Sequence, residues 1–121
     1  MNEKIDILSF CRILTDLTNK DKCDWHPTSH TSRDRLDFKT GYLEITQYQQ
    51  TDKKNKFYRI ELFDSNDMQY VPFEAEKGIE AETEAYVVFG NLYKAIWEYY
   101  IRTRNEKISS FLTEILEQTS K

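Results

Sequence analysis

The chain has 121 residues, of which 39% are hydrophobic and 31% charged, with a formal net charge of −4. This length predicts a single domain over residues 1–121 that can bury its own core beneath a heavily charged surface. The acidic balance argues against a large duplex-DNA footprint, which usually needs a basic face. The N-terminal segment has charges within its first six residues and no long apolar run. We therefore expect neither a secretory signal nor a membrane span, and interpret the chain as cytoplasmic.

The first expected element is a helix over residues 3–17, with Asn2 as its N-cap. Its apolar face recurs at helical spacing and is broad: Ile5, Leu8, Cys11, Leu14 and Leu17, widened by Ile7, Phe10 and Ile13. Burial on more than one side is expected from that width. After a polar connection Trp25 stands alone, and we expect it to pack on the core. Residues 26–33 are polar and are expected to be irregular.

From residue 34 the apolar period changes from helical to alternating, which predicts strands. Leu36 and Phe38 alternate with charged residues, Gly41 follows at a turn, and a second strand is expected over residues 42–49. A third strand is expected over 57–63 and a fourth over 68–73, with Pro72 placing the end of the fourth at an edge. The result is an antiparallel meander of three or four strands.

Five glutamates against one lysine precede the strongest helical pattern: Glu74, Glu76, Glu80, Glu82 and Glu84. Carboxylates at a helix N-terminus are stabilised by about 0.3–1 kcal/mol each. The run is therefore either a solvated helix start or an acidic surface for a basic partner. Residues 84–101 follow as a core helix with apolar side chains at three- and four-residue steps.

A second capping signal lies near the end of this helix, where Thr103 and Glu106 fit the T-x-x-E capping box. We predict a break near residues 102–105 and a shorter last helix. One continuous helix to Gln118 is the alternative, since no Gly or Pro enforces the break. The predicted fold is α+β, with an N-terminal helix, the antiparallel sheet, and two C-terminal helices packed on one of its faces.

Few residues point to chemistry. Cys23, His26 and His30 read C-x-x-H-x-x-x-H, and with Cys11 they match a set of zinc ligands, although no second ligand pair follows downstream. Cys23 and His26 also allow a nucleophile pair, but no oxyanion hole or nucleophile elbow accompanies them. Carboxylates of a magnesium site are available too, although the first two suit a turn equally well: Asp64, Asp67, Glu74 and Glu76. We expect no metal, no cofactor and no enzymatic activity.

The sheet is more informative, because period two places the residues that alternate with the core on its second face. These residues are Tyr42, Tyr48, Phe57, Arg59 and Phe63. If helices cover that face, the rings belong to the core. If it is open, aromatic rings beside Arg suit a protein interface, including one with a second copy of the chain. They also suit stacking of a nucleotide or single-stranded RNA, helped by Lys53, Lys54 and Lys56.

The chain resembles small accessory proteins of phages and other mobile elements. The resembling segments are ILSFCRIL, the isolated Trp25, YLEIT, FYRIELFD, NLYKAIWEYYIRTR and FLTEILEQ. This resemblance implies a role in conflict or regulation, such as inhibition of a host defence system. We accordingly predict a non-enzymatic protein-binding module, with the nucleotide or RNA binder as the alternative.

Overall fold

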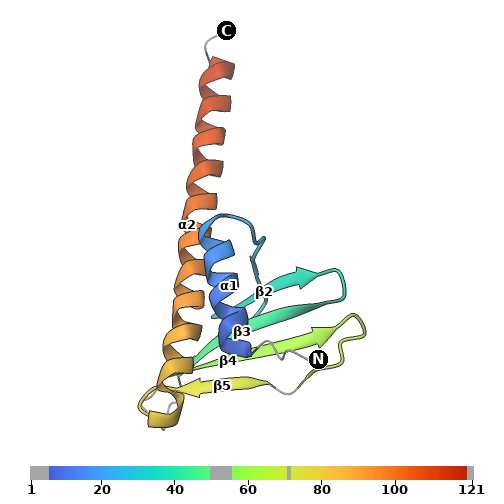
Figure 1. The fold of residues 1–121 in the computed structure, drawn as a ribbon. Helices are drawn as coiled ribbons and strands as arrows, with labels where there is room; N and C mark the ends of the chain where they lie inside the picture. The colour runs from blue at the N-terminus through green and yellow to red at the C-terminus, as the bar shows by residue number, and fades with distance from the viewer. Residues whose placement is uncertain (1–5, 50–55, 71, 120–121) are drawn as a thin grey trace.

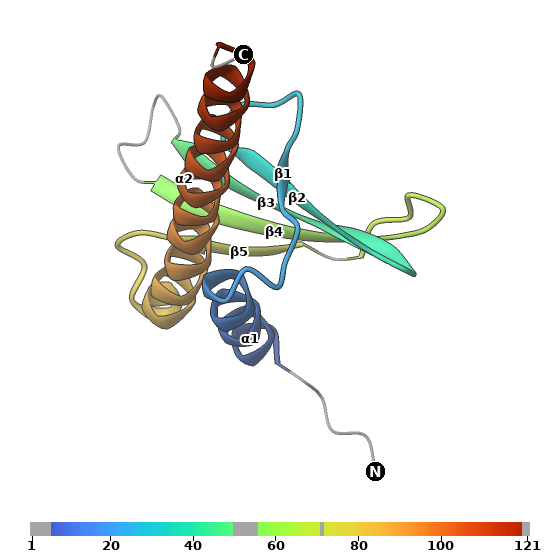
Figure 2. The ribbon, with the colours of Figure 1, turned by 90° about the horizontal axis from the view of Figure 1, so that it is seen from above.

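The computed structural model describes residues 6–49, 56–70 and 72–119, and its two helices lie on one face of an antiparallel sheet (Figures 1 and 2). The elements follow in the order α1 (Ile7–Asn19), β1 (His26–Pro27), β2 (Arg33–Phe38), β3 (Gly41–Gln49), β4 (Lys56–Asp64), β5 (Phe73–Glu76), the short 3-10 helix η1 (Glu80–Glu82) and α2 (Thr83–Thr119). The five strands are ordered β1-β2-β3-β4-β5 in the sheet. The predicted α+β class is confirmed, although β1 adds a short strand within a segment that was expected to be irregular.

Helix α1 begins later than the sequence pattern predicts. The Asp6 carboxylate accepts hydrogen bonds from the backbone N–H groups of Leu8 and Ser9, so Asp6 is the N-cap. The proposed cap Asn2 lies outside the described residues. Cys11, Leu14 and Thr18 form the buried face of α1, whereas Ile13 is exposed, so the expectation that Ile13 widens the core face is wrong.

The β2–β3 hairpin turns at residues 39–40 and places Phe38 opposite Gly41. Glycine is required here because a Cβ atom at residue 41 would lie 2.0 Å from the backbone carbonyl oxygen of Phe63 on β4. Pairing then continues along the whole of β3 and β4, from Gly41 opposite Asp64 to Gln49 opposite Lys56. This long pair forms the centre of the sheet.

The last strand differs from its predicted position. Among the described residues of the predicted strand, Gln69 makes an isolated bridge to Phe63, and Phe73 is the first residue of β5. Strand β5 instead covers Phe73–Glu76 and pairs with β4, from Ile60 opposite Phe73 to Phe57 opposite Glu76. Met68 is held back in the turn, because its N–H donates to the Asp64 carboxylate and its carbonyl accepts from the N–H of Asp64.

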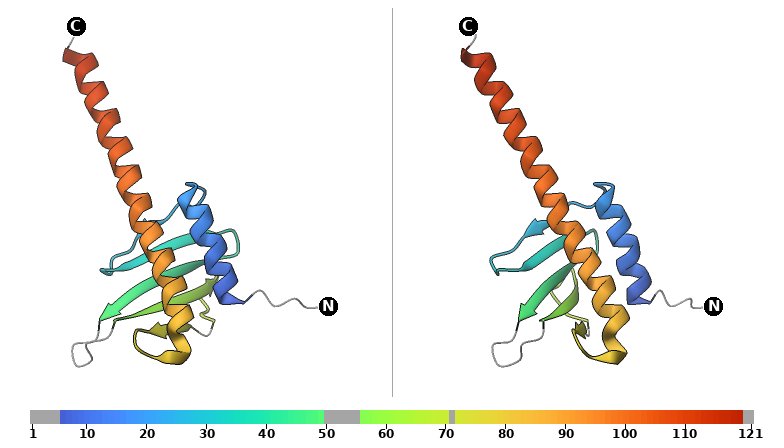
Figure 3. Two further views of the ribbon diagram at one scale, coloured as in Figure 1. Left: turned by 60° about the vertical axis from the view of Figure 1, so that its left-hand side comes forward. Right: turned by 90° about the vertical axis from the view of Figure 1, so that its left-hand side faces the viewer.

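Helix α2 is continuous over its 37 residues, so the predicted break is wrong and the continuous alternative is confirmed. The Thr103 hydroxyl donates to the carbonyl oxygen of Tyr99, four residues earlier, as a Thr inside a helix does, and it caps no new helix. At 1.5 Å per residue the helix is about 55 Å long. Its C-terminal part extends beyond the sheet (Figures 1 and 3).

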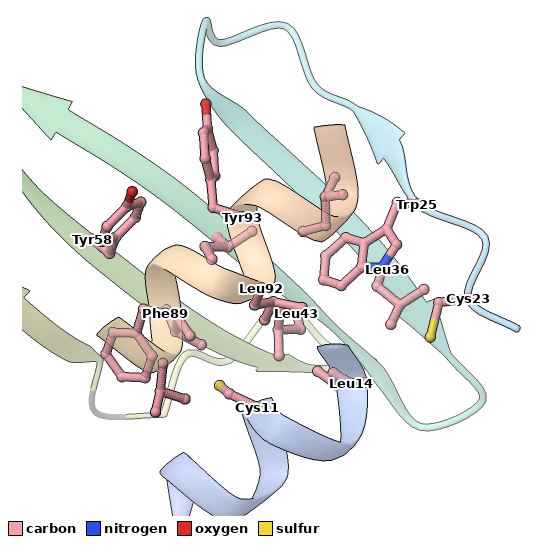
Figure 4. Packing of buried hydrophobic residues seen from close by; sticks show 14 of the residues in the cluster. Cys11, Leu14, Cys23, Trp25, Leu36, Leu43, Tyr58, Phe89, Leu92 and Tyr93 are labelled. Carbon is pink, nitrogen blue, oxygen red and sulfur yellow. The ribbon is translucent and has the colours of Figure 1, made fainter. Parts of the chain in front are cut away.

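The core lies between the sheet and the two helices (Figure 4). Its fully buried side chains come from α1, β3, β4 and the first half of α2, among them Cys11, Leu43, Ile45, Ile60, Phe89, Leu92 and Ile96. Trp25 closes one end as predicted, and its indole N–H donates to the Thr18 hydroxyl over 2.9 Å. Neither helix in the described part of the chain has the length and apolar character that crossing a membrane requires.

Candidate functional site

The five residues predicted for the second face of the sheet do lie on the side opposite the helices. The register pairs Tyr42 with Phe63 and Tyr48 with Phe57, while the alternating positions between them carry the core residues. Both α1 and α2 lie on the other side of the sheet (Figure 3). Within the described residues no helix covers this face, so the interpretation of these rings as core is wrong. Whether they bind a partner stays a prediction.

The rings on this face are nevertheless occupied by one another. Tyr42 and Phe63 stack with centroids 4.7 Å apart. The Arg35 guanidinium carbon lies 3.7 Å from the Tyr42 centroid. Because β2 and β4 flank β3, Arg35 and Phe63 cover the two opposite faces of the Tyr42 ring. Its hydroxyl donates to Asp67 over 2.8 Å. Tyr42 therefore offers no free ring face for stacking a base.

The second aromatic pair is built in the same way. Tyr48 and Phe57 stack with centroids 4.8 Å apart. Arg33 on β2 donates to the Tyr48 hydroxyl over 2.9 Å and to the Thr46 hydroxyl over 3.0 Å. Tyr48 is thus tied to β2 by a hydrogen bond and to β4 by stacking, and both rings are half-buried.

Between the two aromatic pairs, charged side chains neutralise one another. The Arg59 Nε atom lies 3.5 Å from the Glu74 carboxylate and 3.8 Å from that of Glu61. Glu61 is buried and accepts a hydrogen bond from the Gln69 amide over 2.6 Å. Among the described side chains of this face, acidic groups outnumber the three arginines: Asp37, Glu44, Glu61, Glu74 and Glu76. Lys56 is exposed at the start of β4, and Lys53 and Lys54 lie outside the described residues.

The acidic residues that were predicted to form one run before α2 are divided between elements. Glu74 and Glu76 belong to β5, which was not predicted there, while Glu80 and Glu82 belong to η1. Glu82 turns back and accepts a hydrogen bond from the backbone N–H of Glu76. The expectation of a single acidic helix start is therefore wrong, because two of the five glutamates belong to the sheet.

A second candidate surface lies on the C-terminal arm, which we define as residues 104–119 of α2. Every residue of the arm is exposed. Five large apolar side chains on it are 55–60% exposed: Ile108, Phe111, Leu112, Ile115 and Leu116. Their steps of three and four residues place them on one side of the helix, and we name this set the arm stripe. Trp97 and Ile101, 51% and 45% exposed, continue the same line toward the body.

Hydrogen bonds fix the root of the arm to the body. Arg102 donates to the Asp21 carboxylate over 2.9 Å and to the carbonyl oxygen of Thr18 over 3.1 Å. The Tyr99 hydroxyl donates to Asp24 over 3.0 Å. Beside these contacts, an open groove of about 520 Å³ lies between residues 24–27 and the root of the arm. The direction in which the arm leaves the body is thereby set by side chains from the loop after α1.

The residues considered for zinc or nucleophilic chemistry do not converge. Cys23 is buried, and burial raises the pKa of its thiol. His26 bonds to Asp37 over 2.8 Å, and this contact, with one from Arg35, lowers the pKa of the Asp37 carboxyl. His30 is exposed in a loop. Burial also raises the pKa of Cys11, to about 12. Within the described residues no group of three His, Cys, Asp or Glu is placed to hold a metal ion.

The carboxylates considered for magnesium have structural roles instead. Asp64 accepts hydrogen bonds from the backbone N–H groups of Asn66 and Met68, as a turn residue does. Asp67 has φ 61° and accepts from Tyr42. The turn interpretation of this segment is confirmed.

Sequence reasoning missed the arm stripe, because it assigned those residues to a short helix packed on the sheet. The length of the predicted helix, compared with that of the strands, could have revealed it. A strand of nine residues spans about 30 Å, so an unbroken helix to Gln118 overhangs any sheet that strands of that length form. Comparisons of the chain with protein-family models, curated proteins and solved structures found no match.

Proposed function

We propose that this chain is a protein-binding module whose binding element is the arm stripe. The observation that carries the proposal is that five large apolar side chains lie more than half exposed along one side of a helix that extends beyond the body. Monomeric soluble proteins rarely expose contiguous apolar surface of this extent unless it contacts another molecule. A helix with one apolar side is also a common element of protein recognition, through residues spaced three and four apart.

Protein is favoured over a lipid surface by the charges on the arm. Helices that lie on membranes usually carry a polar side rich in Lys and Arg. The arm instead has Arg104 and Lys107 against Glu106, Glu114 and Glu117. The resemblance to phage accessory proteins implies one concrete form of the role, in which the bound protein belongs to a host defence system.

A nucleotide or single-stranded RNA ligand on the sheet has less support. Stacking requires free ring faces, and both faces of the Tyr42 ring are covered by Phe63 and Arg35. Phosphate binding requires excess positive charge, whereas the described side chains of this sheet face are acidic in balance. Saturable, salt-dependent binding of short oligonucleotides that Tyr48→Ala and Phe57→Ala abolish would favour this second function.

The test compares two double variants of the arm. Ile108→Ser with Ile115→Ser removes the centre of the arm stripe, and Ser110→Ala with Thr113→Ala changes the opposite side of the same helix. We expect protein association, measured by chemical crosslinking and by light scattering, to be lost in the first variant and kept in the second. Both should retain the melting temperature of the body, because none of these four residues is buried. Equal association by both variants would contradict the proposal.

A further inference from the structure

The arm stripe has the spacing of a helix-pairing seam. Ile101, Ile108 and Ile115 are seven residues apart, and Phe111 lies between the last two at a spacing of three. These are the a and d positions of a heptad repeat, in which two helices pack side by side. All four residues are at least 45% exposed, and Ile108 and Phe111 also border the open groove between the root of the arm and residues 24–27.

The net charge along the arm changes sign from root to tip. Arg104 and Lys107 outnumber Glu106 near the root, and Glu114 and Glu117 lie toward the tip. Two arms that run antiparallel therefore bring the basic root of each beside the acidic tip of the other. Two parallel arms would instead place Arg104 against Arg104 of the second copy at a seam position, where like charges destabilise the pair.

We propose that the protein which covers the arm stripe is a second copy of this chain, paired antiparallel so that Ile108 of each copy packs on Phe111 of the other. This inference rests on the proposed function and names its partner. In this register Lys107 of each copy lies beside Glu114 of the other, and Ile101 lies level with Gln118 of the other. The overlap covers residues 101–118, about 27 Å of helix.

The five residues of the arm stripe are each a little over half exposed and Ile101 is 45% exposed, so an antiparallel pair of arms covers apolar side chains of both copies. Covering this stripe with its own copy requires no other component.

The first test measures mass by light scattering over about 10–200 μM protein. We expect wild type to be dimeric in this range and Ile108→Ser with Ile115→Ser to weaken the dimer at least tenfold. Lys107→Glu and Glu114→Lys should each weaken it, and the double variant Lys107→Glu with Glu114→Lys should restore it. A dimer that survives the two serines overturns the inference and the proposed function.

The second test fixes the orientation by oxidation of mixed single-cysteine variants. Ile101→Cys and Gln118→Cys copies should form a disulfide with each other when mixed, and neither should crosslink with itself. The native Cys11 and Cys23 are buried and do not interfere. Self-crosslinking of both variants would indicate parallel arms and overturn the antiparallel inference.

The remaining outcomes separate this inference from the proposed function. A wild-type monomer at 200 μM that still crosslinks to a different protein through the arm stripe overturns self-pairing and leaves the proposed function standing. A monomer that gains helicity only with anionic phosphatidylglycerol vesicles overturns both.

Discussion

Tyr100 donates a hydrogen bond to the buried Asp34 carboxylate, and the Tyr100→Phe variant tests how much this bond stabilises the fold. The Tyr100 hydroxyl donates to the Asp34 carboxylate over 2.8 Å, and Asp34 is only 5% exposed. Among the described residues Tyr100 is the one side chain that donates a hydrogen bond to this carboxylate. A hydrogen bond to a charged group contributes about 1.5–3 kcal/mol. We therefore expect Tyr100→Phe to lower the free energy of unfolding by about 2 kcal/mol at pH 7.

The cost of this variant should depend on pH with a defined sign. Burial raises the pKa of the Asp34 carboxyl above its ordinary 3.8, and the Tyr100 hydrogen bond partly opposes that rise. A raised folded-state pKa means that stability is greatest below the unfolded pKa and is lost as pH rises through the folded pKa. Without the hydroxyl the pKa of Asp34 rises further, so the cost of Tyr100→Phe should be larger at pH 7 than near pH 4.

Urea unfolding followed by circular dichroism measures both effects, and Tyr99→Phe is the matched control. It deletes the same hydroxyl one residue earlier, but its acceptor Asp24 is exposed, so we expect a loss of no more than about 0.5 kcal/mol. Equal losses for the two variants, or a Tyr100→Phe cost that does not change between pH 4 and pH 7, would refute the reasoning.

Three further predictions test the body of the fold. Gly41→Ala should lower the free energy of unfolding by more than about 2 kcal/mol or prevent folding, because its Cβ would lie 2.0 Å from the Phe63 carbonyl oxygen. Gly90→Ala should instead stabilise α2 by about 0.5–1 kcal/mol, because the Cβ there makes only ordinary contact with Tyr58. Urea midpoints check both, and a tolerated Gly41→Ala would contradict the close approach of β3 and β4. Burial raises the pKa of the Cys11 thiol to about 12, against 9.0 for an ordinary thiol, so the thiol of the unfolded chain ionises first as the pH rises. The free energy of unfolding of wild type should therefore fall by about 2 kcal/mol relative to Cys11→Ala between pH 8 and about pH 10.5. A constant difference between the two would argue against burial of this thiol. Trp25→Phe should cost about 1–3 kcal/mol through the lost hydrogen bond to Thr18 and the smaller ring, and an unchanged melting temperature would contradict its role in closing the core.

The two central strands were predictable because their information is local. Leu43 and Ile45 alternate with Glu44 and Thr46, and Tyr58 and Ile60 alternate with Arg59 and Glu61, so period two is visible without knowing the fold. The placement of five residues on the second face of the sheet followed from the same period. Their mutual stacking did not, because the pairing of Tyr42 with Phe63 depends on the register between β3 and β4, which a one-dimensional pattern does not contain.

The errors arose at two segments whose local sequence suits two different structures. Residues 68–73 and Phe73–Glu76 both alternate, but the turn at Asp64 holds Met68 and leaves the second segment to pair with β4. Thr103 suits both a cap and a helix interior. Arg102 contacts Thr18 in α1 and Asp21 in the loop after it, and these contacts support α2 through the position of the predicted break. The Arg102 contacts join residues 84 and 81 positions apart, so the local sequence does not reveal them.

The stability of the arm as a helix is linked to the binding of its apolar side. Isolated helices shorter than about 12–15 residues are marginal in water, and most helical stability in proteins comes from packing of an apolar face. The arm is 16 residues long, has Ser, Thr or Asn at positions 105, 109, 110, 113 and 119, and is exposed throughout. Its root is fixed by Arg102, and the groove beside residues 24–27 extends along the arm to Phe111. A helix of this composition is stabilised when its apolar side is covered, so the contact that buries the arm stripe is also the contact that stabilises the arm as a helix.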